Sequence, residues 1–200
     1  MPTTKPFSVE LERWLETDTD KTLGDVQDVF GERTFAVMIL LLMGPSALPL
    51  PTGGLTLVLE AATLLLAVEM VVGRRTVWLP ASWRRHRLGA TTTDKAIPAV
   101  LRFVRWCERW SRPRGAHLLE RGWAWRVLGG LIGLLTVVAS IAPPFSGLDT
   151  LPALGVVLIA LAILLHDLVL AAVGLVIGVA GGLLILTVGA AIARALRSLL

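Results

Sequence analysis

The sequence predicts an all-α integral membrane protein, in which a basic amphipathic interfacial linker joins two helix–Pro/Gly loop–helix repeats. Three observations support this fold class. The 200 residues are 54% hydrophobic and have a mean hydropathy of +0.72, which excludes an ordinary soluble domain. Two apolar stretches are each interrupted by a segment rich in proline and glycine. Between them lies a stretch rich in arginine and tryptophan, which is typical of a membrane interface.

The expected order of segments is an acidic amphipathic start, a membrane hairpin, a basic interfacial or cytoplasmic linker, a second membrane hairpin and a glycine-rich membrane helix. Their bounds are residues 1–34, 35–73, 74–121, 122–167 and 168–200. The start carries eight acids and four Lys/Arg over residues 1–33. It is polar and lacks the apolar core of a secretory signal peptide. Apolar residues at roughly helical spacing after Ser8 predict an amphipathic helix that lies on the membrane or on the protein.

The first hairpin begins with a short apolar arm. Residues 35–44 would form a helix of about 15 Å, half of a hydrocarbon core of about 30 Å. Three prolines follow, at Pro45, Pro49 and Pro51. The next arm, residues 55–73, is long enough to span and contains two carboxylates, Glu60 and Glu69.

The linker is strongly basic, since residues 74–126 carry thirteen Lys/Arg and three acids. Such clusters suit the headgroups of anionic lipids better than nucleic acid when membrane segments flank them. The positive-inside rule therefore places the linker in the cytoplasm. A single cysteine, Cys107, excludes an internal disulfide and gives no metal pattern. The residues expected at the membrane interface are Arg74, Arg75, Trp78, Trp83, Trp106 and Trp110.

The second hairpin begins with residues 125–142, which are long and apolar enough to span. Pro143 and Pro144 break it, and a second apolar arm runs over residues 151–167. The glycine-rich helix that follows has small residues at spacing four, namely Gly174, Gly178 and Gly182. They predict close helix packing, and small-residue faces of this kind favour a homodimer.

The two breaks match one another. When Gly53 is aligned with Gly147, Pro49 meets Pro143, Thr52 meets Ser146 and Thr56 meets Thr150. This pattern indicates an internal duplication. Irregular backbone survives in lipid only where protein or water covers it, and transporters built from repeats have such breaks at their binding sites. Two alternatives stay open: re-entrant hairpins, or external turns between fully spanning helices.

Ionisable residues inside apolar arms usually face a partner or a cavity. Glu60 is either a proton carrier or a structural hydrogen-bonding group. A salt bridge to Arg74 or Arg75 is expected for Glu69, and Asp149 is expected to cap the next helix. The residues proposed to bind an ion or a proton are Glu60, Asp149, Thr52, Thr56, Ser146 and Thr150, with the Ser46 hydroxyl beside them.

The segments "FGERTFAVMILLLMGPSALPLPTGG" and "GRRTVWLP" resemble the first half of the ExoD family of bacterial inner-membrane proteins. "RPRGAHLLERGWAWRVLGGLIGLL" and "LPALGVVLIALAILLHD" resemble its second half. The resemblance implies a role in envelope polysaccharide production or in cation and proton homeostasis under alkaline conditions. A departure is Glu69, where glutamine is common in the family. The matching motif residues are Pro49, Pro51, Arg74, Arg75, Pro80, Arg112, Pro113, Arg114, Glu120, Arg121, Pro152 and Asp167.

No catalytic motif is present in the sequence: there is no GxSxG, HExxH, CxxC or phosphate loop. We therefore expect no enzyme activity, no metal and no cofactor. The leading hypothesis is a multi-pass protein of the bacterial inner membrane that supports alkali tolerance by cation/proton exchange. A non-transporting scaffold for exopolysaccharide synthesis and a lipid-moving protein are the alternatives. The expected partners are anionic lipids, a monovalent cation, a proton and a second copy of the chain.

Overall fold

The fold is helical throughout the part of the chain that the structure describes, which confirms the all-α class. The computed structural model describes residues 33–48, 55–78, 102, 105, 121–142 and 146–199. Its helices are α3 (Arg33–Met43), α4 (Leu55–Val72), α8 (Gly122–Ile141), α9 (Thr150–Leu165) and α10 (Leu168–Leu199). The predictions for the acidic start, and for Trp83, Trp106 and Trp110 in the linker, lie outside the described residues.

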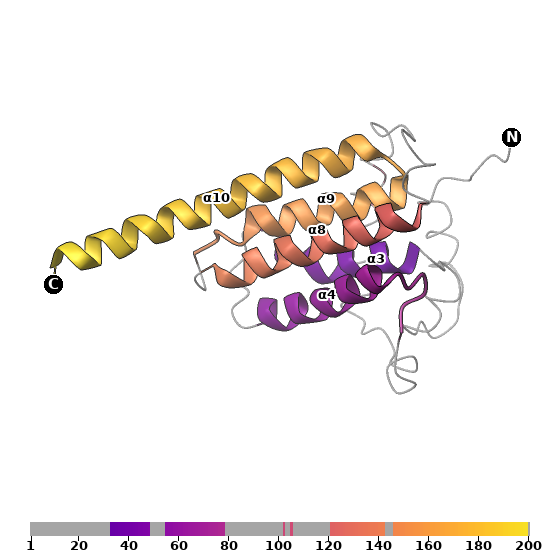
Figure 1. Ribbon diagram of the computed structural model, residues 1–200, viewed down its shortest axis with the longest axis horizontal. Coiled ribbons are helices and arrows are strands. Elements are labelled where there is room, and N and C mark those ends of the chain that lie inside the picture. Colours follow the sequence, from indigo (N-terminus) through magenta and orange to yellow (C-terminus); the bar gives the residue numbers. More distant parts are fainter. Residues whose placement is uncertain are drawn as a thin grey trace, which may run out of the picture.

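The helices lie side by side in one bundle (Figure 1). The most extensive packing joins α9 to α10 and α4 to α8, while α3 packs against α9 and α4, and α8 also contacts α9. The start of α4 and the turn between α8 and α9 lie at the same end of the bundle. We call this the loop end. The end of α4 and the start of α8 lie at the other end, which we call the arginine end.

Helix α9 is the centre of the core. Its residues are apolar all round, and most of them are buried, including Ala153, Val156 and Ile159. A helix that is hydrophobic on every side is stable only where neighbours cover it, and α3, α8 and α10 do so here. Helix α3 is almost as deeply buried, and its Phe35 ring meets the Trp125 ring of α8 edge to face at 5.5 Å.

Glycines allow the backbones of α9 and α10 to pack in direct contact. A Cβ atom on Gly155 would lie 2.7 Å from both the Gly174 carbonyl oxygen and the Gly178 Cα atom. The predicted packing role of Gly174 and Gly178 is therefore confirmed, and Gly155 is their partner. Gly182 contributes less, since a Cβ atom there would meet only the Val138 side chain at 3.2 Å. Because this ridge packs within the chain, it gives no support to a homodimer.

The turn between α9 and α10 ends one helix and caps the next. His166 adopts a left-handed conformation with φ 55° and ends α9. The buried side chain of Asp167 accepts a hydrogen bond from the Val169 N–H at 3.0 Å through Oδ1. This bond satisfies one of the free N–H groups in the first turn of α10.

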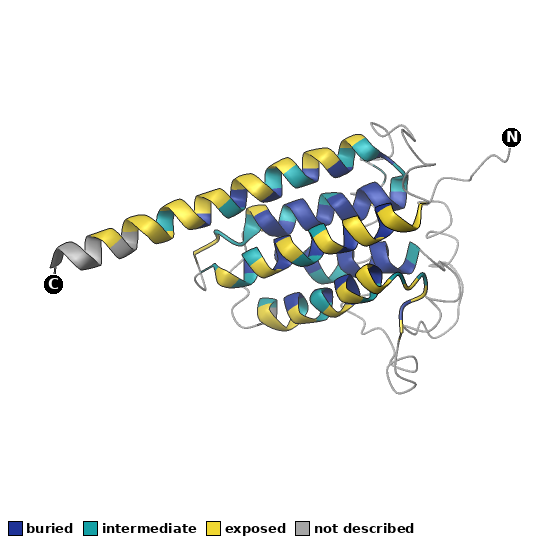
Figure 2. Cartoon of the chain, viewed as in Figure 1, coloured by how far each residue is buried: buried dark blue, intermediate teal, exposed yellow. Residues whose placement is uncertain are grey.

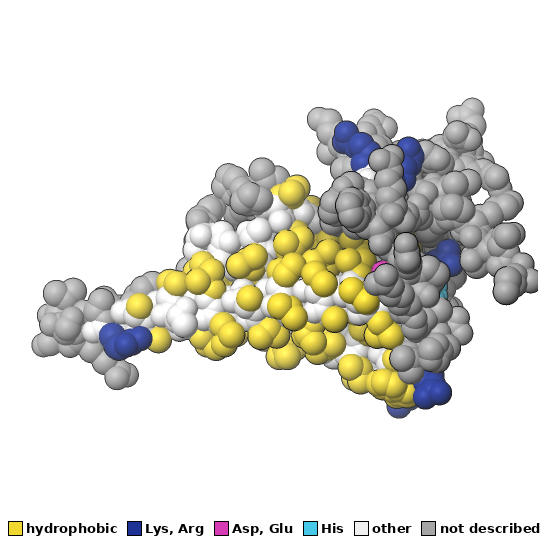
Figure 3. All heavy atoms as spheres, turned by 90° about the horizontal axis from the view of Figure 1, so that it is seen from above, with side chains coloured by type: hydrophobic (Ala, Val, Ile, Leu, Met, Phe, Trp, Pro, Cys, Tyr) yellow, Lys and Arg dark blue, Asp and Glu magenta, His cyan; other side chains and the backbone are white. Residues whose placement is uncertain are grey.

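Two helices in the described part are long and apolar enough to cross a membrane, by length and composition: Gly122–Ile141 and the stretch Leu168–Ala191 of α10. Only 28% of the apolar window in α10 is buried in the bundle, so α10 differs from the core helix of a soluble protein. Exposed side chains recur along α10 as far as its burial is described (Figure 2). In the space-filling view, hydrophobic side chains form a band, and Lys and Arg gather near the two ends (Figure 3).

We predict that Gly155→Ala destabilises the protein by about 1–3 kcal/mol, because the added methyl group meets backbone atoms that cannot move aside. The matched control is Gly130→Ala, since no atom lies within 4 Å of a Cβ at this exposed position of α8. Thermal unfolding of the detergent-purified protein measures both. Equal midpoints for the two variants would contradict the close α9–α10 packing.

Candidate functional site

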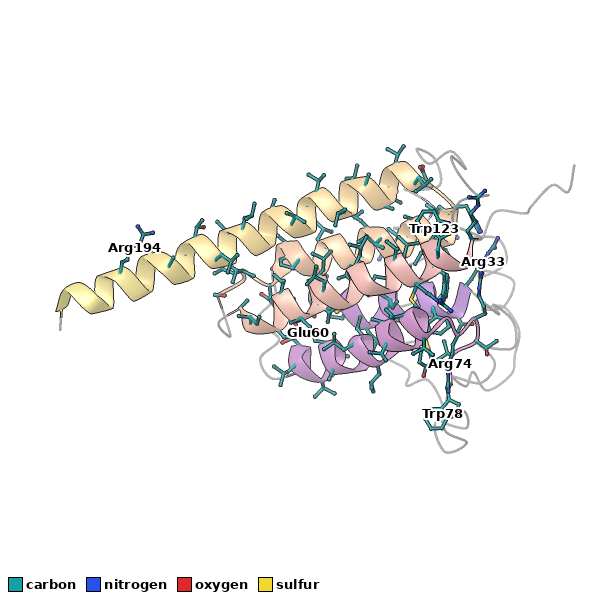
Figure 4. The ribbon with its side chains drawn as sticks, viewed as in Figure 1. Arg33, Glu60, Arg74, Trp78, Trp123 and Arg194 are labelled. Carbon is teal, nitrogen blue, oxygen red and sulfur yellow. The ribbon has the colours of Figure 1, made fainter. Side chains whose placement is uncertain are left out.

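Glu60 is the buried carboxyl at the loop end of the bundle. Its side chain is 3% exposed and lies on α4, one turn past Thr56. Two groups from the second half of the chain act on it: the Ser140 hydroxyl of α8 lies within hydrogen-bonding reach, and the charge of Asp149 is close enough to repel a carboxylate. Figure 4 shows Glu60 between α4 and α8, at the opposite end from Arg74 and Trp78. The structure thus brings together the two carboxyl groups that the sequence singled out.

Ser140 is a functional neighbour that the sequence analysis missed. Its hydroxyl donates to the Thr136 carbonyl oxygen at 2.9 Å, and the Thr136 hydroxyl donates to the Ile132 carbonyl oxygen at 2.8 Å. A serine hydroxyl has one proton and two lone pairs. A protonated Glu60 can therefore donate to the Ser140 oxygen without disturbing this chain of bonds. An ionised Glu60 instead competes with the Thr136 carbonyl for the Ser140 proton.

Asp149 occupies the N-cap position of α9, but its side chain makes no capping hydrogen bond. The expectation that it caps the helix through its carboxylate is wrong. Its backbone has helical angles, φ −66° and ψ −24°, and its carbonyl oxygen accepts from the Ala153 N–H at 3.0 Å. An extended N-cap backbone would aim the carboxylate at the first turn, whereas this helical one leaves it free to act on Glu60.

The hydroxyl-bearing residues predicted to bind an ion do not all lie in one place. The Ser146 oxygen accepts from the Leu148 N–H at 3.2 Å and so stabilises the turn before α9. Thr150 belongs to the same turn, because its N–H donates to the carbonyl oxygen of Gly147, which has φ +68°. Thr56 is half-buried on α4. Thr52 and the prolines Pro49, Pro51, Pro143 and Pro144 lie outside the described residues.

Ser46 is buried in the turn that follows α3. Its side chain is 2% exposed, and its oxygen is the one buried side-chain polar atom in the described ranges without a hydrogen-bond partner. A buried hydroxyl left unpaired costs about 1–3 kcal/mol, so such a group calls for an explanation. Pro45 precedes Ser46 in the same turn. Because proline has no backbone N–H, Pro45 cannot donate a hydrogen bond to the Ser46 oxygen.

The arginine end is organised around Trp125. The Trp125 indole N–H donates to the Arg74 carbonyl oxygen at 2.9 Å, and the Arg75 guanidinium lies 5.5 Å from the centre of the same ring. Glu69 accepts from the Trp78 N–H at 2.8 Å. This backbone contact takes the place of the salt bridge that the sequence predicted between Glu69 and Arg74 or Arg75, because the chain turns back over α4 after Gly73.

The described residues at the two ends form no arrangement suited to a transition metal. Within the described residues, no group of three or more His, Cys, Asp or Glu side chains lies close enough together to hold a metal ion. What the loop end offers is oxygen ligands: two carboxyl groups and the Ser140 hydroxyl. Hard oxygen ligands suit small cations, and a shielded carboxyl also suits a proton.

Comparison with known proteins gives one family and one relative. The family model described as "Exopolysaccharide synthesis, ExoD" matches residues 7–187. The uncharacterized protein slr1875 of Synechocystis sp. is 25% identical over 166 residues, which cover 83% of this chain and 77% of that protein. No solved structure matches the chain.

We predict that Trp125→Phe destabilises the protein by about 1 kcal/mol, since it removes the hydrogen bond to the Arg74 carbonyl oxygen and keeps an aromatic ring in the core. Trp123→Phe is the matched control, because Trp123 lies two residues away on the same helix and is 58% exposed. The comparison uses thermal unfolding in detergent. A midpoint for Trp125→Phe that equals that of the control would argue against a stabilising role for this bond.

Proposed function

Because this chain belongs to the ExoD family of exopolysaccharide synthesis, we propose that it is a multi-pass protein of the bacterial inner membrane that exchanges monovalent cations for protons at Glu60. Such exchange would acidify the cytoplasm under alkaline conditions and so support alkali tolerance. The observation that carries the proposal is the buried Glu60 carboxyl beside Ser140 and Asp149, at the end of the bundle where α4 begins and α8 turns into α9.

The position of Glu60 along the bundle supports a site within the bilayer. Fourteen residues separate Glu60 from Arg74, and fourteen separate Ser140 from Arg126, which corresponds to about 21 Å of helix rise in each case. Arg194, at the far end of α10, is twenty-six residues from Leu168, or about 39 Å. If Arg74, Arg126 and Arg194 mark the two interfaces, Glu60 and Ser140 lie within a hydrocarbon core of about 30 Å. The α8 helix, which ends at Ile141, would then stop inside the core, so the second hairpin would be re-entrant.

The pairing of helices supports the internal repeat. In the alignment of the two halves, α3 corresponds to α8 and α4 corresponds to α9. The structure packs α3 against α9 and α4 against α8. The first helix of each half therefore packs against the second helix of the other half. A pseudo-two-fold axis that relates the two halves would produce this pairing.

Exchange follows from competition for one carboxyl group. In the protonated state, Glu60 is neutral and donates to the Ser140 oxygen. In the ionised state, the Glu60 and Asp149 carboxylates together repel one another and attract a cation. Since the same carboxyl oxygens bind either the proton or the cation, loading one releases the other.

We predict that Glu60→Gln reduces cation-driven proton efflux from proteoliposomes to less than about a tenth of the wild-type rate, because an amide cannot carry a proton. Glu69→Gln is the matched control, since the amide oxygen can still accept from the Trp78 N–H. A pH-sensitive dye inside the liposomes records efflux under sodium or potassium gradients. If Glu60→Gln transports as well as Glu69→Gln, or if the wild type moves no protons under any alkali-cation gradient, the exchange proposal is wrong.

A non-transporting scaffold for exopolysaccharide assembly is the second candidate, and the description of the family favours it. A scaffold does not need the buried carboxyl, so Glu60→Gln would leave polysaccharide output in cells unchanged. A lipid-moving protein would instead transfer labelled lipid between leaflets in liposomes without any cation gradient. The same reconstituted protein thus separates the three functions.

We predict that the linker, residues 74–121, lies in the cytoplasm, because it concentrates the positive charge of the chain. A single cysteine at position 90 (Ala90→Cys with Cys107→Ser) should resist an impermeant maleimide in intact cells and react after the membrane is opened. Labelling in intact cells would contradict this topology.

A further inference from the structure

The arginine end contains the guanidinium groups of Arg74 and Arg126. Arg126 packs against the C-terminus of α4, and Arg74 directly follows that terminus in sequence. Gly73 has φ +93° and its N–H donates to the Met70 carbonyl oxygen, while the Arg74 N–H donates to the Glu69 carbonyl oxygen. These two bonds form a Schellman motif, which requires a residue with positive φ at this position.

Gly73 also makes room for Arg126. A Cβ atom on Gly73 would lie 3.1 Å from both the Nε and an Nη atom of Arg126, so the guanidinium lies directly against this glycine. Arg126 comes from the first turns of α8, and Arg74 directly follows Gly73 in sequence. Both side chains are exposed. One positive charge therefore lies against Gly73 and the other belongs to the residue that follows it, at the junction of α4 and α8.

Two tryptophans belong to the same end of the bundle. Trp78 is 63% exposed and Trp123 is 58% exposed. Figure 4 shows Trp78 beside Arg74 and Trp123 beside Arg33, both at this end and away from Glu60 and Arg194. An exposed tryptophan has an apolar ring and one N–H donor, a combination favoured at the level of lipid headgroups. The apolar band of the surface reaches this end (Figure 3).

We propose that Arg74 and Arg126, beside Gly73, bind the phosphate of an anionic phospholipid such as phosphatidylglycerol. Guanidinium groups bind phosphate oxygens in a bidentate manner and are weakly hydrated, which suits an interfacial site. Trp78, the exposed tryptophan beside Arg74, contacts the glycerol and upper acyl region of the lipid. Glu69, the nearest acid on α4, is held by the Trp78 N–H and points its charge toward that backbone. This inference is independent of ion exchange at Glu60.

The test is lipid binding to the full-length protein in a neutral detergent, measured by native mass spectrometry with phosphatidylglycerol and, separately, with zwitterionic phosphatidylethanolamine. We expect phosphatidylglycerol to bind more tightly, and Arg74→Gln combined with Arg126→Gln to weaken its binding about tenfold, since each bond to a charged group is strong. Arg194→Gln is the matched control, because that guanidinium lies at the far end of α10, where its Nε donates to the Ala190 carbonyl oxygen.

Arg126→Gln could also unfold the end of α4, so Arg74→Gln alone is measured beside it, together with the unfolding midpoint of each variant without lipid. Weaker binding at an unchanged midpoint supports the site. Equal losses for Arg194→Gln and the double variant would overturn it. Equal binding of the two lipids would overturn it too, and so would inorganic phosphate at millimolar concentration stabilising the wild type as much as phosphatidylglycerol does.

Discussion

The contact between the backbones of α9 and α10 is the constraint on which the rest of the bundle depends. At Gly155 the two helices approach so closely that not even a methyl group fits between them. In lipid there is little hydrophobic drive to bring helices together, so close van der Waals packing must supply the association. Once α10 covers one side of α9, α3 and α8 cover the others, and α4 rests on α8. The central helix is therefore buried although, after Thr150 at its start, it carries no polar side chain.

The helices themselves could be predicted from the sequence because prolines and glycines mark where they end. The arm before Pro45 ends at Met43, and Gly73 ends the arm that begins at Leu55. Proline removes a backbone donor and glycine permits positive φ, so both act locally and independently of the fold. The side-chain partners were harder to predict. Glu69 had two arginines nearby in sequence, but the path of the chain after Gly73 gave it the Trp78 N–H instead.

Ser140 illustrates a different limit of sequence reasoning. A serine in an apolar helix normally satisfies itself by bonding to the carbonyl oxygen four residues earlier, and Ser140 does so. Nothing in its local sequence therefore distinguishes it from a structural serine. The signal available in the sequence was a spacing: Ser140 lies fourteen residues from Arg126, and Glu60 lies fourteen residues from Arg74. Its meaning depends on α4 and α8 running antiparallel side by side, which only the three-dimensional structure supplies.

The apolar length of α10 has a consequence for the bilayer itself. The stretch Leu168–Ala191 has 24 residues, or about 36 Å, whereas the eighteen residues of α4, on the other side of the bundle (Figure 1), cover about 27 Å. One side of the molecule is thus matched to a membrane thicker than the average and the opposite side to a thinner one. A bilayer of about 30 Å accommodates the long helix if it tilts by roughly 30–35°. In the proposed membrane protein, this difference in hydrophobic thickness would make the molecule a wedge in the plane of the membrane, with thinner lipid beside α4 than beside α10.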